Sequence, residues 1–431
     1  MHRHVVALGL GSNLDTPLDY LREALRQIKK IEHVQVLAAS SIYESDAQLP
    51  ENAPAGWNLT YLNAVILCQV NDQLQPLELL YALKKIEVKM GRLQSERWAP
   101  RVIDIDILDW ENTTLNEKEL KLPHPRLVER PFALLPLLEV IPNYKVKNPP
   151  HWLNDWVTEI PFGTQKSKTA FWPRLVAVMN ITTDSFSDGG LLLNSDSLLA
   201  HAEKILSDGA EIIDIGAEST RPQAAFVSNE VEFKNLKWGL DLLRPLRKKL
   251  NFKVSLDCRR PEVVRQILES HRIDYLNDVS GFNSTDMQNL LKSSKAQAFV
   301  MHSLSIPADP MNVLEDDENP FDVLEMWWKR KKSALLAAGI HSDRLIFDPG
   351  IGFGKTKRQC LYLLKNLSKL AEFKTDVLIG HSRKSFQTLY SDQEASRRDT
   401  ETALVTKDLN KAYMQYLRVH DVTSQKSALR Y

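Results

Sequence analysis

Cysteine is scarce in this sequence, and neither sign of charge is in excess. The 431 residues include three cysteines, at Cys68, Cys258 and Cys360, which lie far apart. Disulfide frameworks and structural zinc sites need clustered cysteines, so this spacing favours free thiols. Acidic and basic residues balance at 55 each, with no basic stripe or polybasic tail. The balance argues against nucleic acid or an anionic membrane as a main partner, and any anion site must be local.

Long apolar runs are also missing. No stretch approaches the roughly 18 apolar residues of a membrane helix. The first residues, MHRHVVALGLGSNL, lead into an apolar strand without the order of a secretory leader. We therefore expect a cytoplasmic protein with no membrane partner. Because 431 residues exceed one core of typical size, we also expect two domains.

The first half, residues 1–150, mixes strands and helices without strict alternation. Two amphipathic helices are expected at 17–31 and 76–90, between apolar runs with the character of strands. This order predicts an α+β sandwich of ferredoxin-like type with a mostly antiparallel sheet. Residues 143–172 contain paired prolines and three tryptophans and have no sustained period, and we place the linker at 151–172.

From residue 173 to 431, short apolar runs alternate with helix-length segments. Eight candidate strands over about 245 residues match a (β/α)8 barrel, or TIM barrel, although a doubly wound open sheet would also alternate. Active sites of the barrel lie at the carboxyl ends of its strands, where this sequence places polar residues. These strand-end residues are Asn180, Asp214, Asp257, Asn277, Asp278, His302, Asp348, Ser382 to Lys384, Arg418 and His420.

Two aspartates, Asp104 and Asp106, interrupt the aliphatic run VIDIDIL in the first half. Side chains at i and i+2 share one face of a strand, so these carboxylates project together and repel unless a cation lies between them. Magnesium suits such a pair, because it combines one or two carboxylates with phosphate oxygens. Alone, the pattern fits a solvated edge equally well. The residues around the aspartate pair favour a polyphosphate site, because arginine pairs with phosphate oxygens. These residues are Glu87, Arg92, Arg97, Trp98, Arg101, His124, Arg126 and Arg130.

Five motifs of the first half resemble, in order and spacing, the hydroxymethyldihydropterin pyrophosphokinase family over residues 3–142. They are LGLGSNL, YLNAVI, IEVKMGR, ERWAPRVIDIDIL and LPHPRLVERPF. The resemblance implies transfer of pyrophosphate from ATP to a reduced hydroxymethylpterin, releasing AMP. It implies that Asp104 and Asp106 bind two Mg²⁺ ions. It assigns ATP to Glu87, Arg92, Arg101, His124 and Arg130, and the pterin to Tyr61, Asn63, Trp98 and Phe132. Gln94 departs from the arginine that the family often carries.

The glycine-rich stretch DPGIGFGKT invites comparison with a phosphate-binding P-loop. That pattern needs a glycine five residues before Gly354, where this sequence has Pro349, so the P-loop is rejected. The glycines favour close approach of the backbone to a ligand, with Lys355 nearby. At the end of the chain, Arg418 and His420 share one strand face, and with Asn180 they can hold a pyrophosphate and its magnesium.

Seven motifs of the second half resemble dihydropteroate synthase over residues 174–423: MNITTDSFSDGG, IIDIGAESTRP, SLDCRRPEV, LNDVSG, FDPGIGFGK, GHSRKS and RVHDV. The resemblance implies condensation of 4-aminobenzoate with hydroxymethylpterin pyrophosphate, inhibition by sulfonamides, and a homodimer formed through barrel helices. It assigns the pterin to Asp257, Asn277, Asp348 and Lys384, the pyrophosphate to Asn180, Arg418 and His420, and the aminobenzoate to Thr220, Arg221, Pro222, Phe353 and Ser382. Thr183, Gln223 and Cys258 depart from the family pattern.

The two resemblances reinforce each other, because one half would make what the other consumes. We therefore predict a bifunctional transferase of folate biosynthesis that uses ATP, hydroxymethyldihydropterin and 4-aminobenzoate. Its expected catalytic residues are Asp104, Asp106, Arg92, Arg101, Asp257 and Lys384. Two alternatives stay open: one half is retained only as a scaffold, or the barrel is a folate-binding methyltransferase with a corrinoid partner, which would need no pyrophosphate site.

Overall fold

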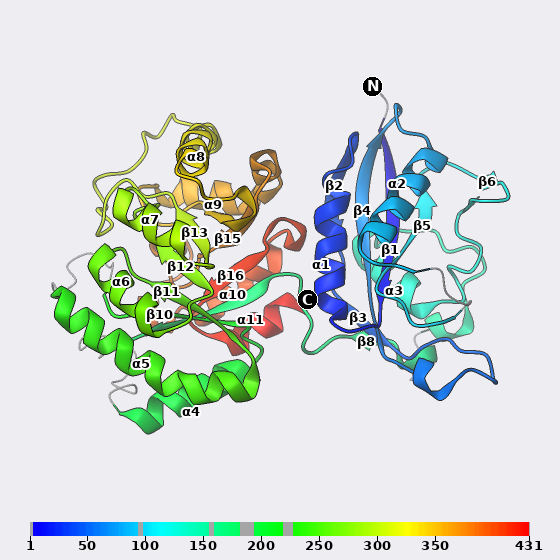
Figure 1. Ribbon diagram of the computed structural model, residues 1–431. Coiled ribbons are helices and arrows are strands. Elements are labelled where there is room, and N and C mark those ends of the chain that lie inside the picture. Colours follow the sequence, from blue (N-terminus) through cyan, green and yellow to red (C-terminus); the bar gives the residue numbers. More distant parts are fainter. Residues whose placement is uncertain (1–2, 94–97, 155–158, 182–193, 219–226, 431) are drawn as a thin grey trace. The chain divides into compact units, whose positions relative to one another are not determined.

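The computed structural model describes residues 3–93, 98–154, 159–181, 194–218 and 227–430. The chain divides into two compact units, Met1–Trp172 with Arg430–Tyr431, and Pro173–Leu429. Each unit has its own sheet (Figure 1). In the described segments, no helix combines the length and the apolar character needed to cross a membrane.

The described residues of the first unit form an antiparallel sheet and three α-helices, which confirms the predicted α+β sandwich. Its strand order is β5-β1-β4-β3-β8, and β2 pairs with the other part of β4. All three helices begin with proline, whose fixed φ suits the first helical position. The elements are β1 (Arg3–Ser12), α1 (Pro17–Ile28), β2 (Val34–Ala39), β3 (Tyr43–Ser45), β4 (Tyr61–Asn71), α2 (Pro76–Lys89), β5 (Asp104–Trp110), β6 (Leu115–Asn116), β7 (Lys121–Leu122), α3 (Pro131–Val140) and β8 (Gln165–Lys166).

The described residues of 151–172, where we placed the linker, belong to the first unit. Strand β8 adds to the sheet beside β3. Trp172 is buried, and its Nε1 donates a hydrogen bond of 2.6 Å to the carbonyl oxygen of Ser40. The apolar residues of this stretch therefore complete a core, and the chain passes from one unit to the next between Trp172 and Pro173.

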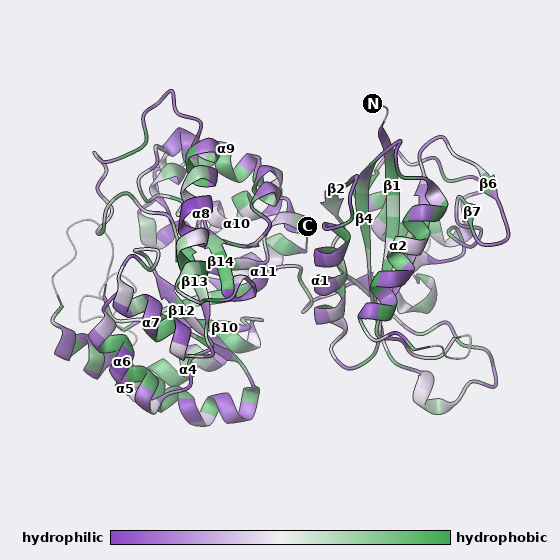
Figure 2. Ribbon diagram, turned by 45° about the horizontal axis from the view of Figure 1, so that its top comes forward, coloured by the Kyte–Doolittle hydropathy of each residue, from purple (hydrophilic) through white to green (hydrophobic). Residues whose placement is uncertain are grey.

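The second unit is a closed barrel of eight parallel strands, which confirms the TIM barrel and excludes the open sheet. Figure 2 shows hydrophobic colouring along β13 and β14 and hydrophilic residues on the surrounding helices. The strands are β9 (Arg174–Asn180), β10 (Ile212–Gly216), β11 (Lys253–Asp257), β12 (Tyr275–Asp278), β13 (Gln297–Met301), β14 (Leu345–Asp348), β15 (Asp376–Ile379) and β16 (Tyr416–Val419). The helices are α4 (Ser195–Ser207), α5 (Asn229–Leu250), α6 (Pro261–Ser270), α7 (Thr285–Ser293), α8 (Pro320–Ala337), α9 (Lys357–Lys365), α10 (Asp399–Asp408) and α11 (Val422–Leu429).

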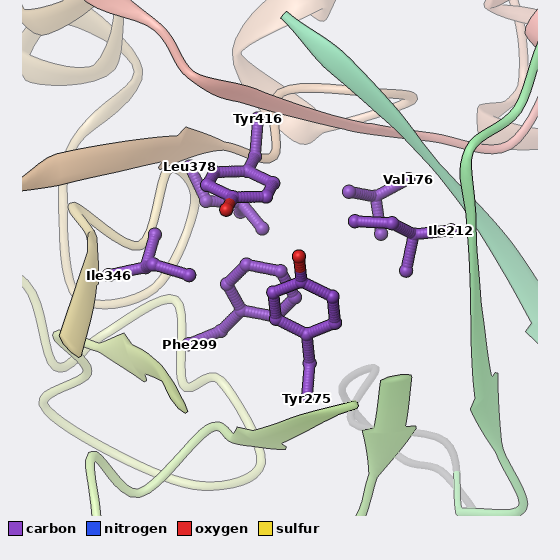
Figure 3. Packing of buried hydrophobic residues seen from close by; sticks show 7 residues of the cluster. All are labelled: Val176, Ile212, Tyr275, Phe299, Ile346, Leu378 and Tyr416. Carbon is purple, nitrogen blue, oxygen red and sulfur yellow. The ribbon is translucent and has the colours of Figure 1, made fainter. Parts of the chain in front are cut away.

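An apolar layer fills the interior of the barrel (Figure 3). The rings of Tyr275 and Phe299 stack with centroids 4.9 Å apart, and Tyr416 meets both edge-on. Because side chains alternate along a strand, residues two positions later face the interior as well. The layer is therefore a floor beneath polar side chains nearer the carboxyl ends of the strands. Its members are Val176, Ile212, Tyr275, Phe299, Ile346, Leu378 and Tyr416.

Candidate active sites

In the first unit, Asp104 and Asp106 face the same side of β5, opposite Gly11 and Gly9 of β1. The alternate residues of this stretch, the isoleucines at 103, 105 and 107, are buried in the core. This alternation fixes the direction of both carboxylates, as predicted from the sequence. Both line one cavity, together with Tyr61, Asn63, Trp98, Arg101, Arg130 and Phe132.

Side-chain cations surround the aspartate pair. Arg92 Nη1 lies 2.6 Å from both Asp104 Oδ1 and Glu87 Oε2, and Arg101 Nη1 lies 3.0 Å from Asp104 Oδ2. Buried Glu87 braces β5, because its Oε1 accepts a 2.7 Å hydrogen bond from the backbone N–H of Ile105. Glu87, Arg92 and His124 do not line the cavity. Arg92 pairs directly with Asp104, and Glu87 is connected to Asp104 through Arg92.

The two carboxylates have opposite pKa shifts. Burial and the neighbouring negative charge of Asp104 raise the pKa of Asp106 to about 6. The pKa of Asp104 is below its usual value. Burial acts to raise this pKa, but the positive charges of Lys84, Arg92 and Arg101 have the larger combined effect and lower it. Like charges at such spacing disfavour joint ionisation. A cation with access to both carboxylates would therefore stabilise the fully charged pair.

Aromatic and amide groups also line this cavity. Phe132 is held edge-on by Phe162 at 5.7 Å, and Asn63 Nδ2 donates a hydrogen bond of 3.0 Å to Ser45 Oγ. The guanidinium of Arg126 lies 5.2 Å from the centre of the Trp98 ring. A flat heterocycle between aromatic side chains, with an amide at its edge, fits this arrangement.

His124 is close to the arginine cluster, and it is neutral at physiological pH. Burial and the positive charges of Arg130 and Arg126 lower its pKa to about 4. Its Nδ1 accepts a 3.2 Å hydrogen bond from the backbone N–H of Arg126. His124 can therefore act as a neutral hydrogen-bonding partner.

Sequence reasoning missed Lys84 in this site. Its Nζ lies 3.8 Å from Asp104 Oδ1 and 3.8 Å from Asp106 Oδ1. The available signal was its i, i+3 spacing from Glu87 on α2, which puts both residues on one helix face. Arg97 and Gln94 lie outside the described residues.

In the second unit, most of the expected residues converge on one hollow at the mouth of the barrel. Its lining includes Asn180, Asp257, Phe353, Ser382, Lys384, Arg418 and His420. Asn277 and Asp348 are buried at strand ends, close beneath the mouth. Asp214 differs from expectation, because it lies in the middle of β10 and is fully buried. The aminobenzoate candidates Thr220, Arg221 and Pro222, and the departures Thr183 and Gln223, lie outside the described residues.

Arg418 organises the carboxylates of the barrel mouth. Its Nε lies 2.5 Å from Asp214 Oδ2, and its Nη2 lies 2.6 Å from Asp257 Oδ2. Asn277 Nδ2 donates a 3.0 Å hydrogen bond to the same oxygen of Asp214. These side chains form one network directly above the aromatic floor.

Burial raises the pKa values of the mouth carboxylates. The pKa of Asp257 rises to about 7, because burial and the charges of Asp214, Glu232 and Asp278 outweigh the attraction of Arg418. Burial also raises the pKa of Asp348, against a 2.7 Å hydrogen bond that its Oδ1 accepts from Gly350 N–H. These carboxylates can exchange hydrogen bonds with an uncharged ligand edge.

The remaining candidates form two contacts at the rim. Lys384 Nζ lies 4.1 Å from the centre of the Phe353 ring, within range of a cation–π interaction. His420 Nδ1 lies 3.0 Å from Ser382 Oγ. The structure thus brings together residues that the resemblance assigns to pterin pyrophosphate, Lys384 and His420, and residues that it assigns to aminobenzoate, Phe353 and Ser382.

A buried lysine–histidine pair supports this rim and was not assigned a role from the sequence. Lys355 Nζ lies 2.9 Å from His302 Nδ1 and donates a 2.9 Å hydrogen bond to the Phe353 carbonyl oxygen. Burial lowers the pKa of Lys355 to about 8, and burial together with Lys355 lowers the pKa of His302 to about 3. The pair fixes the backbone of the glycine-rich loop.

Metal binding in either unit would rely on few protein ligands. In the part of the chain that the structure describes, no group of three or more His, Cys, Asp or Glu residues is arranged to hold a metal ion. Asp104 and Asp106 nevertheless fit a hard divalent ion, because their oxygens share one face and phosphate oxygens can complete the coordination.

Family models match both units. Residues 7–142 match 7,8-dihydro-6-hydroxymethylpterin-pyrophosphokinase (HPPK), and residues 176–420 match pterin binding enzyme. A "Folate synthesis bifunctional protein" from Chlamydia caviae is 34% identical, covering 98% of this chain and 96% of the relative. This chain belongs to the bifunctional folate-synthesis family.

Solved structures of dihydropteroate synthase resemble the barrel unit. Dihydropteroate synthase from Yersinia pestis, in a sulfonamide drug complex, has a TM-score of 0.55 and 29% identity, covering 60% of this chain and 92% of that one. The Anaplasma phagocytophilum enzyme with 6-hydroxymethylpterin-monophosphate has a TM-score of 0.54 and 30% identity, covering 60% and 97%.

A bifunctional folate-synthesis protein is a transferase with two consecutive reactions. This chain transfers pyrophosphate from ATP to 6-hydroxymethyl-7,8-dihydropterin and then condenses the product with 4-aminobenzoate to form 7,8-dihydropteroate. The alternative that the barrel is a folate-binding methyltransferase with a corrinoid partner is therefore rejected.

Proposed function

We propose that the cavity beside β5 is the ATP and pterin site of the pyrophosphokinase step, within residues 1–150. The observation that carries this proposal is the arrangement of two carboxylates, arginines and aromatic rings around one cavity. Asp104 and Asp106 would hold two Mg²⁺ ions, which supply positive charge beside the transferring phosphates. Arg92, Arg101 and Arg130 would neutralise the triphosphate, and Glu87 and His124 would complete the ATP site.

The pterin would lie between the aromatic side chains of that cavity. Trp98, Phe132, Tyr61 and Asn63 all line this cavity. Neutral His124, like the fixed guanidinium groups, orients ATP without having to lose a proton. Positioning and charge neutralisation account for most of the barrier reduction in such transfers.

We propose that the barrel mouth, within residues 173–431, performs the condensation. The observation that carries this proposal is the Asp214–Arg418–Asp257 network with Asn277 above an apolar floor. Asp257, Asn277, Asp348 and Lys384 would bind the pterin. Asn180, Arg418 and His420 would bind the pyrophosphate, with magnesium at Asn180. Phe353, Ser382 and the undescribed Thr220, Arg221 and Pro222 would bind the aminobenzoate.

The condensation needs little acid–base chemistry from the chain. The aromatic amine is already a nucleophile, so no general base is required for its attack. As the carbon–oxygen bond to pyrophosphate breaks, positive charge develops on the pterin, and a carboxylate such as Asp257 stabilises it. Arg418 neutralises the departing pyrophosphate.

Two variants of the whole chain test these assignments separately. Asp104→Asn should abolish AMP formation but leave dihydropteroate formation from supplied pterin pyrophosphate. Asp257→Asn should have the reverse effect. AMP release that persists in Asp104→Asn, or condensation that persists in Asp257→Asn, would contradict the corresponding site.

The Yersinia pestis structure with a sulfonamide drug supports a sulfonamide site in this chain. A sulfonamide resembles aminobenzoate, so it should occupy the rim near Phe353 and Ser382. Inhibition of the second step should be competitive with aminobenzoate, while AMP formation from the first step is unchanged. Inhibition that added aminobenzoate does not relieve would contradict this site.

A homodimer formed through the barrel helices and a cytoplasmic location remain predictions. Sedimentation of the full chain should give twice the monomer mass, and cell fractionation should recover the protein with cytoplasmic enzymes. A monomer at micromolar concentration, or recovery with membranes, would contradict the respective prediction.

A further inference from the structure

We infer that Lys84 is a resident counter-ion of the Asp104–Asp106 pair, which a divalent cation must displace to bind. This inference rests on the proposed metal site and adds a residue that sets its affinity. Lys84 lies on α2, which packs against β5. Its role would be to keep the carboxylate pair neutralised until nucleotide and metal arrive.

The Lys84 ammonium lies among four oxygen atoms. Nζ is 2.8 Å from Glu87 Oε1 and 3.1 Å from the Ile105 carbonyl oxygen, in addition to the two aspartate oxygens at 3.8 Å. Carboxylate and carbonyl oxygens are also the ligands that hard cations prefer. A lysine ammonium is a compact point charge, so it can substitute for such an ion in the electrostatics of the site.

The position of Lys84 differs from that of the neighbouring arginines. Arg92 and Arg101 contact Asp104, whereas Lys84 is within ion-pair distance of both aspartates. A divalent ion shared by the pair would occupy the same region, and two cations there repel each other. Metal entry thus requires Lys84 to move.

Lys84 is able to move away from the aspartates. Its side chain is 39% exposed, while its partner Glu87 is 3% exposed and fixed beneath β5. The flexible four-carbon stem can carry Nζ outward while the backbone stays in place. Nucleotide phosphates supply further oxygen ligands to the metal, so they shift the competition in favour of the metal. Lys84 would therefore make metal binding depend on nucleotide.

Metal binding without nucleotide tests this inference directly. Free and bound Mn²⁺ can be distinguished by electron paramagnetic resonance on the full chain, with Asp104→Asn defining the binding that belongs to the aspartate pair. Lys84→Met removes the charge and keeps the stem, and should tighten Mn²⁺ binding about tenfold, equivalent to ~1.4 kcal/mol. Lys84→Arg should stay near the wild-type Kd. Lys85→Met, on the exposed side of the same helix, is the matched control and should change Kd less than about twofold, as expected of a distant solvated charge.

Two further readouts separate this role from a structural one. An ATP analogue with a methylene bridge between its α and β phosphates should reduce the difference in Mn²⁺ affinity between Lys84→Met and wild type. Without metal, Lys84→Met should unfold at a lower temperature than Lys85→Met, and Mn²⁺ should restore that loss. Unchanged or weaker Mn²⁺ binding in Lys84→Met would overturn the inference. Equal Mn²⁺ binding by wild type and Asp104→Asn would instead overturn the proposed metal site.

Discussion

Single side chains of this protein neutralise the charges of its own buried carboxylates. Arg418 is the clearest case, because it bridges Asp214, which is fully buried, and Asp257. Removing one partner of a buried ion pair leaves an uncompensated charge, which is far more costly than losing an exposed pair. The arginine is therefore important for stability as well as for the proposed pyrophosphate contact.

Arg418→Met should accordingly destabilise the barrel by about 3–5 kcal/mol. Urea unfolding at pH 7, followed by tryptophan fluorescence, measures this change. The matched control is Arg272→Met, since Arg272 is 82% exposed and lies 3.9 Å from Asp274, and an exposed pair contributes at most ~1 kcal/mol. Equal effects of the two substitutions would show that the buried network does not stabilise the barrel.

His381 links residue chemistry to the pH dependence of folding. It is fully buried, and its Nε2 lies 2.9 Å from Thr406 Oγ1 and 3.2 Å from the Thr402 carbonyl oxygen. Burial lowers its pKa to about 4. In the unfolded chain a histidine takes up a proton near pH 6.5, whereas the folded chain excludes that proton until about pH 4, so acid favours unfolding in this window.

The contribution of His381 to stability should therefore fall by roughly 3 kcal/mol between pH 7 and pH 4. His381→Gln removes this titration, so the difference in unfolding free energy between wild type and variant should shrink as pH falls. His341→Gln makes the same substitution at an exposed histidine and is the matched control. Parallel pH profiles for wild type and His381→Gln would contradict the assignment.

At the scale of elements, the loop after β14 depends on a backbone contact. Gly350 has a φ of +62°, and a Cβ at this position would lie 2.0 Å from the carbonyl oxygen of His302. His302 in turn pairs with Lys355, which holds the Phe353 carbonyl. A side chain at Gly350 would thus push apart two loops of the barrel mouth.

Gly350→Ala should destabilise the barrel by about 2–3 kcal/mol, which is the upper part of the range for overpacking. The same substitution should raise the KM for aminobenzoate. Gly209→Ala is the control, because Gly209 also has a positive φ, of +110°, but open space at its Cβ. Thermal unfolding and steady-state kinetics of both variants separate backbone strain from the contact. A smaller loss in Gly350→Ala than in Gly209→Ala would contradict the role of this contact.

The alternation of side chains along strands allowed part of the candidate sites to be predicted from the sequence. The period of two placed Asp104 and Asp106 on one face, and the polar strand ends identified the barrel mouth. Lys84 escaped prediction because its contact with the aspartates depends on how α2 packs against β5, which no local pattern specifies. Asp214 was placed at a strand end because the strand was taken to finish two residues early.

At the scale of the whole molecule, composition and rhythm predicted two domains of different classes. The packing of residues within 151–172 against the first unit could not be predicted, because β8 and Trp172 contact residues far away in sequence. The pairing of both units in one chain is consistent with consecutive reactions, since the product of the first is the substrate of the second.

Product analysis by mass spectrometry shows in one experiment whether both units of this chain are active. The purified chain would receive 6-hydroxymethyl-7,8-dihydropterin, ATP, Mg²⁺ and 4-aminobenzoate together. We expect AMP and 7,8-dihydropteroate, and we expect pterin pyrophosphate to accumulate when aminobenzoate is omitted. Accumulation of pterin pyrophosphate with aminobenzoate present would contradict an active barrel, and the absence of AMP would contradict the pyrophosphokinase site at Asp104 and Asp106.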